Sequence, residues 1–180
     1  MRFCFFLLLV FCIMMSCKNK YETEKVSVEN RFSVELPYHL KKTKGLNEDA
    51  ILQYSNAVQE LYVVVLEEKK DKLLNSLNKD SLSKENNVMS LEKYSSLCYE
   101  RLENHTEELK DFDVKNSVIN GLNAKDAEFV VKISGVNMYY NYVILEGTDY
   151  YYQLFIWTLL RHKRDHHSSI RHIISTFCEY

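Results

Sequence analysis

The second half of the chain is divided by closely spaced turns, which constrain its fold more than any other feature. Asn120-Gly121 favours a two-residue type I′ hairpin, because both central residues of that turn need positive φ. Ser134-Gly135 and the segment Glu146–Asp149 provide looser turns at strand-like spacing. Between the turns lie apolar and aromatic runs: a strand ending at Asn120, then Ala124–Ser134, Asn137–Glu146 and Tyr150–Thr158. Residues 118–157 therefore predict an antiparallel β-meander, on which the rest of the chain packs.

Three more strands are predicted before the meander. In Arg31–Pro37, apolar residues alternate with polar ones and the run stops at proline, which indicates a half-buried strand. Ala50–Asn56 and Glu60–Glu67 are rich in β-branched and aromatic residues and lie close enough to form a hairpin. The continuous apolar run Leu61–Leu66 favours a central strand that is covered on both faces.

Two amphipathic helices frame the meander. The first begins after Ser90, a favourable N-cap residue, and its apolar stripe has helical spacing: Leu91, Tyr94, Cys98 and Leu102. The second runs from about Asp165 to Thr176 and carries a stripe at i, i+3, i+4 and i+7: Ile170, Ile173, Ile174 and Phe177. Both stripes are predicted to lie on the sheet, which gives an α+β fold.

The amino terminus has the pattern of a secretory leader. Met1-Arg2 is positively charged, and a nearly unbroken apolar run follows from Phe3 to Met15. A transmembrane helix is the less favoured interpretation, because spanning a bilayer takes about 20 apolar residues. We expect residues 1–16 to be removed as a signal peptide.

Cys17 follows Ser16 at the end of this run and resembles the lipobox cysteine of bacterial lipoproteins. The resemblance implies that Cys17 is acylated and becomes the first residue of an envelope protein held on its membrane by lipid. An unprocessed or conventionally cleaved leader is the alternative. Lys18, in place of an acidic residue, favours the outer membrane by similarity to lipoprotein sorting rules.

Residues 17–29 are polar and predict a flexible tether before a single globular domain over residues 30–180.

Charge and motifs exclude several classes of function. The chain has 23 Lys and Arg against 25 Asp and Glu with no basic block, so nucleic acid is not expected as a partner. It contains no Gly-x-Ser-x-Gly elbow, no Gly-rich phosphate loop and no Cys-x-x-Cys pair. We therefore expect no catalytic residues, no cofactor and no enzymatic activity.

Taken in order, the motifs resemble those of the PsbP-like domain family. The resemblance covers residues 30–178 and rests on a strand ending in Leu36-Pro37, the helix start Leu91–Tyr94, the Asn120-Gly121 turn, the aromatic strand Tyr150–Trp157 and the closing Ile173–Phe177. It implies an α-β-α sandwich, in which amphipathic helices flank a central antiparallel sheet. It also implies a binding or scaffolding role without catalytic residues.

Four histidines crowd the start of the closing helix. His162 and His166 have the i, i+4 spacing that zinc ligands use. Basic residues surround the group, and no Cys or Glu completes a ligand set at a suitable spacing. We favour a solvated basic helix start over a metal site for His162, His166, His167 and His172.

Cys98 and Cys178 are the thiols that remain after lipidation. An exported protein permits a disulfide between them. Cys98 falls on the apolar stripe of its helix, where free cysteine is common as a small hydrophobe. We favour free thiols, and a disulfide between the two residues is the alternative.

The tyrosines of the meander are the remaining candidates for a binding surface. Six of them lie on two adjacent predicted strands, and strand alternation places rings on both faces of the sheet. Burial of every ring under helices is the simpler interpretation. If some are exposed, Tyr140, Tyr142 and Tyr151 are the candidates, because tyrosine is enriched at interfaces. The sequence then predicts a protein partner, with a periplasmic small-ligand carrier or sensor as the alternative.

Overall fold

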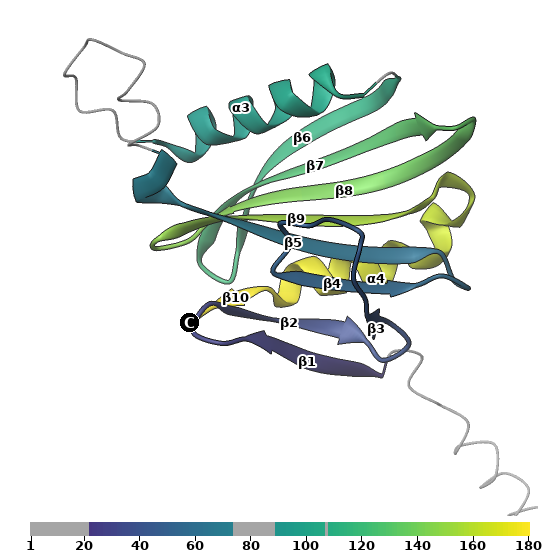
Figure 1. Cartoon of the computed structure of the whole chain (residues 1–180), viewed down its shortest axis with the longest axis horizontal. Coiled ribbons are helices and arrows are strands. Elements are labelled where there is room, and N and C mark those ends of the chain that lie inside the picture. Colours follow the sequence, from purple (N-terminus) through teal and green to yellow (C-terminus); the bar gives the residue numbers. More distant parts are fainter. Residues whose placement is uncertain (1–21, 74–88, 107) are drawn as a thin grey trace, which may run out of the picture.

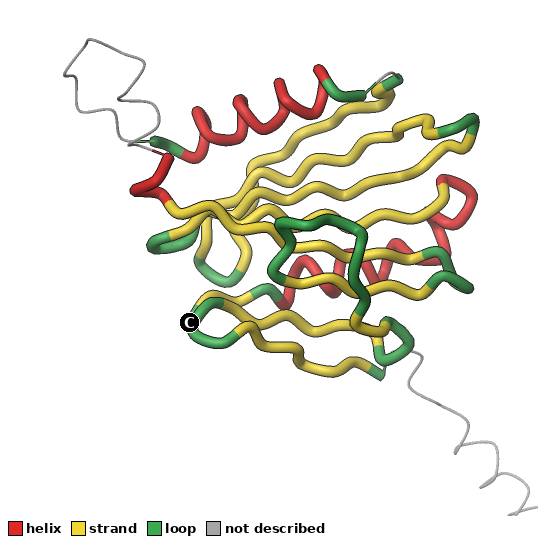
Figure 2. Tube along the Cα trace, in the orientation of Figure 1, coloured by secondary structure: helices red, strands yellow, loops and turns green. Residues whose placement is uncertain are grey.

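The computed structural model describes residues 22–73, 89–106 and 108–180, and it contains two antiparallel sheets together with helices (Figures 1 and 2). The larger sheet has seven strands in the order β3-β4-β5-β9-β8-β7-β6. Their bounds are β3 Lys41–Lys42, β4 Leu52–Asn56, β5 Leu61–Lys69, β9 Tyr150–Leu159, β8 Val136–Glu146, β7 Leu122–Ile133 and β6 Leu109–Ile119. The prediction of an α+β fold built on an antiparallel sheet is confirmed.

The meander β6-β7-β8-β9 is the centre of this sheet, and its first two turns are tight. Asn120 and Gly121 have φ values of 47° and 87°, as a type I′ turn requires, and Ile119 faces Leu122 across the turn. Ser134-Gly135 was predicted as a looser turn. It has the same geometry, with φ values of 49° and 84°, because Ile133 and Val136 also pair directly across two residues.

A smaller sheet of three strands lies beside the large one, in the order β1-β2-β10. Its strands are β1 Thr23–Val28, β2 Phe32–Pro37 and β10 Cys178–Glu179. Strand β1 corrects the predicted tether, because residues 23–28 pair along the whole of β2. A turn with Asn30 at φ 56° joins the two strands, and Val26 and Val28 pack against the core. The predicted leader 1–16 and Cys17 lie outside the described residues.

The main core lies between the two sheets and around α4, Lys163–Thr176, which follows the 3₁₀ turn η1, Leu160–His162. The predicted stripe of α4 is buried there together with apolar residues of β2, β5, β8 and β9. Phe177, just after the helix, stacks on Phe32 at a centroid distance of 4.7 Å. The side chain of Asn120 donates to the carbonyls of Ser175 and Phe177 at 2.9 and 2.8 Å, which ties the β6–β7 turn to the end of α4.

A second core lies under α3, Leu91–Asn104, which runs along the β6–β8 side of the sheet in Figure 1. Ser90 caps the helix as predicted, because its hydroxyl accepts from the backbone N–H of Lys93 at 3.3 Å. Tyr94 and Cys98 point from the helix into this core. They pack among strand residues of the meander, including Ala127, Phe129, Tyr142, Ile144 and Tyr151. Within the described ranges, no helix is both long and apolar enough to cross a membrane.

Candidate functional site

Four aromatic rings form a row across the strands β7, β8, β9 and β5. We call Phe129, Tyr140, Trp157 and Tyr62 the aromatic strip. Strand register places each ring opposite the next, because Phe129 pairs with Tyr140, Tyr140 with Trp157, and Trp157 with Tyr62. Successive ring centroids are 5.3, 5.7 and 5.3 Å apart, with interplanar angles of 7°, 18° and 10°. The rings are therefore stacked on one face of the sheet.

Helix α3 covers only one end of the aromatic strip. Phe129 is buried in the core under the helix, whereas Tyr140, Trp157 and Tyr62 are half-buried. Ile133 and Val136 lie on the same face by strand alternation, and they are 48% and 45% exposed. The strip and these two residues together form the aromatic face. It is an apolar surface that the described part of the chain leaves partly open.

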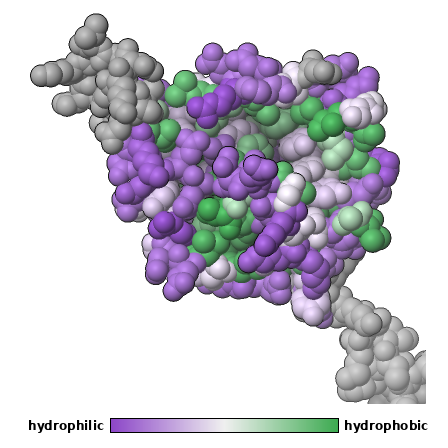
Figure 3. All heavy atoms as spheres, viewed as in Figure 1, coloured by the Kyte–Doolittle hydropathy of each residue, from purple (hydrophilic) through white to green (hydrophobic). Residues whose placement is uncertain are grey.

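A groove separates the C-terminal end of α3 from the aromatic face. Its outer part has a volume of about 530 Å³. Leu102, His105 and Thr106 line one side, and the floor consists of β7–β9 residues: Phe129, Val131, Lys132, Ile133, Ser134, Tyr140 and Phe155. An inner part of about 240 Å³ shares Leu102, His105 and Phe155 with it. Figure 3 shows the surface hollowed beneath α3, and we call this hollow the α3 groove.

The inner end of the α3 groove is polar and fixed by hydrogen bonds. Tyr142 donates to Gln153 Oε1 at 2.6 Å, and Gln153 Nε2 donates to the hydroxyl of Tyr94 at 2.8 Å. Burial is the main cause that raises the pKa of Tyr142 well above its usual value, and it raises the pKa of Tyr94 as well. These hydroxyls therefore stay neutral at physiological pH. They hold the wall of the groove in place rather than supplying a base.

The three predicted tyrosines have different positions. Tyr140 lines the α3 groove, and Tyr142 reaches its inner end from a buried position. Tyr151 belongs to the core under α3, where its hydroxyl donates to the carbonyl of Met89 at 2.5 Å and its ring stacks on Tyr94. Burial, with the Glu146 carboxylate nearby, raises the pKa of Tyr151 to about 12. The structure thus brings Tyr140 and Tyr142 to one groove and leaves Tyr151 out.

Sequence reasoning missed Trp157, Tyr62 and Phe155, which complete the aromatic face and the groove. Trp157 and Phe155 were assigned to a strand but not to a surface. Tyr62 lies in the run that was predicted to be covered on both faces. The available signal was alternation along Tyr150–Thr158, which places Trp157 on the same face as Phe155.

The histidines of α4 and its preceding turn have separate partners. His162 lies between the carboxylates of Glu60 and Asp165, at 3.2 and 3.1 Å. His166 contacts the carbonyl of Gln59 at 2.7 Å, and His172 contacts Glu35 at 3.0 Å. In the ranges that the structure covers, no three His, Cys, Asp or Glu side chains form a group that could hold a metal ion.

Cys98 and Cys178 are free thiols, the first buried and the second exposed. Burial is the main cause that raises the pKa of Cys98. A protonated thiol packed among aromatic rings behaves as a small apolar side chain.

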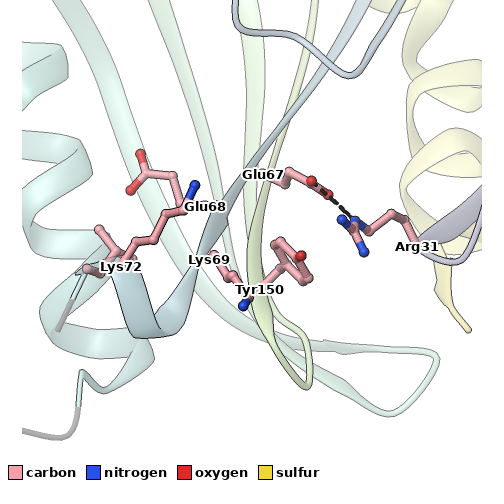
Figure 4. A pocket seen from close by; sticks show the side chains of 7 residues that line it. Arg31, Glu67, Glu68, Lys69, Lys72 and Tyr150 are labelled. Carbon is pink, nitrogen blue, oxygen red and sulfur yellow. Dashed lines mark hydrogen bonds and ion pairs between the residues drawn. The ribbon is translucent and has the colours of Figure 1, made fainter. Parts of the chain in front are cut away.

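A charged hollow of about 440 Å³ lies at the C-terminal end of β5, where Arg31, Glu67, Lys69 and Tyr150 are among the residues that line it (Figure 4). Arg31 donates through Nε to both carboxylate oxygens of Glu67, at 3.2 and 3.1 Å. Its guanidinium also lies 4.3 Å from the centroid of the Tyr150 ring. Because Glu67 already neutralises Arg31, this hollow offers an anionic ligand little free positive charge at that side chain.

No protein-family model and no curated protein matches the sequence. Solved structures do match the fold. The solution structure of cyanobacterial PsbP from Synechocystis sp. PCC 6803 aligns with a TM-score of 0.62 at 9% identity, covering 93% of this chain and 99% of that one.

Two further structures share the arrangement. LpqN, described as involved in cell envelope biogenesis of Mycobacterium tuberculosis, aligns with a TM-score of 0.52 at 9% identity and covers 89% of this chain and 92% of its own. The Ran-binding protein Mog1p of Saccharomyces cerevisiae aligns with a TM-score of 0.53 at 8% identity, over 88% and 95%. At these identities the likeness concerns the fold. The chain has the PsbP-like fold that its sequence motifs indicated.

Proposed function

We propose that this chain is a lipid-anchored protein of the bacterial cell envelope whose domain binds a protein partner through the aromatic face, without catalysing a reaction. The observation that carries the proposal is the stacked aromatic strip, which continues from the core under α3 onto an open surface. A strip that only stabilised the fold would gain more free energy by being covered.

The composition of the aromatic face is typical of protein interfaces. Tyrosine and tryptophan are enriched there, because each offers a large apolar body with a polar tip and loses little side-chain entropy on binding. Ile133 and Val136 add exposed aliphatic surface at one end. Arg101 and His105 lie along the α3 side of the groove and provide a polar rim.

The anchoring part of the proposal rests on the sequence. The leader over residues 1–16 and the lipobox-like Cys17 support export and acylation, and Lys18 supports the outer membrane. LpqN, a structure of similar fold, is described as acting in cell envelope biogenesis, which is compatible with this location. We interpret the domain as an α-β-α sandwich, with α3 and α4 packed against different cores of the large sheet and the small sheet beyond α4.

One observation favours a small-ligand carrier or sensor as the second candidate. The α3 groove ends in the buried polar groups of Tyr142 and Gln153, and a few fixed polar groups at the end of an apolar groove are typical of ligand sites. The outer part of the groove opens beside the exposed Ile133. Such an open groove is better suited to the surface of a protein partner than to a small ligand that must be enclosed.

Photo-cross-linking in intact cells tests the partner. A photoreactive amino acid in place of Tyr140 should give one discrete protein adduct, because this position lies on the aromatic face. The same residue in place of Tyr38, which is 58% exposed and lies away from the aromatic face on the β2–β3 connection, is the matched control and should give none. Adducts of equal yield at both positions, or none at Tyr140, would contradict the proposed surface.

A further inference from the structure

Strand β6 is the last strand of the large sheet, and among the residues that the structure describes it pairs with β7 alone. A register shift between Lys110 and Asp113, with Asp111 at φ 54°, interrupts its first half. From Asp113 to Ile119 the pairing is regular. This stretch therefore presents one complete edge with backbone groups that β7 does not use.

The turn that follows determines which backbone groups point outward. Ile119 and Leu122 flank a two-residue type I′ turn, so they form a hydrogen-bonded pair. Alternation then directs the N–H and C=O groups of Val118, Asn116 and Val114 away from β7. The edge is held in place, because Asn120 anchors the turn to the carbonyls of Ser175 and Phe177.

The other edges of the two sheets are less suited to pairing. β3 and β10 have two residues each, and the β3 residues are both lysines. The β1 edge carries the charged pair Glu24 and Lys25. Short strands and edge charges are common protections against pairing. β6 also carries charges, but Asp113 and Lys115 pair with each other at 2.9 Å. The residues whose backbone groups point outward are uncharged, and two of them, Val114 and Val118, are 37% and 69% exposed.

We propose that β6 pairs antiparallel with β6 of a second copy of this chain, about a two-fold axis at Asn116. In this register Val114 of each copy lies opposite Val118 of the other, and Lys115 lies opposite Ser117. A shift that centres the pair on Lys115 places two lysines opposite each other, which is unfavourable. A shift of the register by one residue would place residues opposite each other whose side chains lie on different faces of the sheet. The surface is separate from the aromatic face, so the pairing goes beyond the proposed function.

The paired segment is short, and stable interfaces bury about 1,200–2,000 Å² in total. We therefore expect a dimer that dissociates on dilution. Confinement to one membrane through the proposed lipid would raise the local concentration and favour pairing.

Cysteine cross-linking on the full chain tests both the partner and the register. The background keeps the buried Cys98 and replaces the other cysteines, Cys4, Cys12, Cys17 and the exposed Cys178, with serine. Asn116→Cys should give a covalent dimer with a short bifunctional thiol reagent, since facing Cα atoms in a hydrogen-bonded pair are about 5.5 Å apart. Val118→Cys alone should give much less, and mixing it with Val114→Cys should restore the dimer.

Two controls decide the outcome. Val58→Cys lies on a turn and is 94% exposed, so it reports random collisions. Adding Val118→Lys to Asn116→Cys should reduce the dimer roughly tenfold, which corresponds to about 1.4 kcal/mol of association free energy, whereas adding Val58→Lys should not. Cross-linking of Asn116→Cys no greater than that of Val58→Cys, or equal cross-linking of all three single variants, would overturn the proposal.

Discussion

At the scale of single residues, the buried tyrosines show how the fold provides hydrogen-bond partners for their hydroxyl groups. Tyr139 donates to Glu128 at 2.7 Å, Tyr152 donates to Glu179 at 3.1 Å, and Tyr151 donates to the carbonyl of Met89. All three rings are buried. A buried hydroxyl without a partner costs free energy, so each ring contributes its apolar area to the core only because its hydroxyl is paired.

The raised pKa values of two tyrosines predict that the protein loses stability at alkaline pH. Burial raises the pKa of Tyr140 and of Tyr151 from 10.0 to about 12, and the Glu146 carboxylate contributes at Tyr151. A tyrosine whose pKa is higher in the folded state than in the unfolded state contributes stability that is fully present below pH 10. This contribution is lost as the pH rises from 10 through about 12, because the unfolded chain then releases protons that the folded chain retains. Thermal unfolding across this range should show a falling melting temperature, together with late tyrosinate absorbance. Titration of every tyrosine near pH 10 in a folded chain would contradict this burial.

The same residues explain why the candidate site could be predicted only in part. Alternation in the sequence correctly places rings on both faces of the sheet, and Tyr140 does line the α3 groove. It cannot predict how far a helix extends over a face. Helix α3 covers Tyr151 and leaves Trp157 half-buried, and this difference depends on where α3 crosses the sheet.

At the scale of elements, strong periodicity made the two helices and the meander predictable. Their stripes and turns lie where the sequence places them. β1 was missed because Thr23–Val28 is mostly polar and has only Val26 and Val28 as apolar residues. Its strand conformation depends on pairing with β2 through the turn at Asn30. An edge strand with one partner carries little signal of its own.

The contribution of the closing segment can be measured at Phe177. Its ring is fully buried and contacts Phe32 and Tyr152 at centroid distances of 4.7 and 5.3 Å. Phe177→Ala should lower the free energy of unfolding by about 3–5 kcal/mol. Phe112→Ala is the matched control, because Phe112 is half-buried on the edge strand β6 and should cost less. Equal small losses in denaturant unfolding would mean that the closing segment is peripheral.

At the scale of the whole molecule, the order of the strands in the large sheet could not be predicted from the sequence. β5 pairs with β9 along its full length, from Leu61 opposite Thr158 to Lys69 opposite Tyr150. No short-range signal specifies such a pairing, because register between distant strands is set by which faces become buried. This pairing brings Tyr62 beside Trp157 and thereby completes the aromatic strip.

The proposed lipid anchor predicts a change in location without a change in fold. Cys17→Ser removes the thiol that would be acylated, and Cys17 precedes the first described strand. We expect the variant to leave the membrane fraction while keeping the melting temperature of the parent chain. Retention on membranes after a high-salt wash would mean that something other than lipid at Cys17 holds the protein.

The most direct test of the aromatic face uses Trp157, because the sequence contains a single tryptophan. The full chain labelled with 5-fluorotryptophan should give a fluorine resonance that reports this face alone. We predict that it shifts or broadens when a solubilised envelope fraction containing the partner is added. Val136→Lys should weaken this change, and Val58→Lys should not. An unchanged resonance while the chain demonstrably binds its partner would contradict the proposed role of the aromatic face.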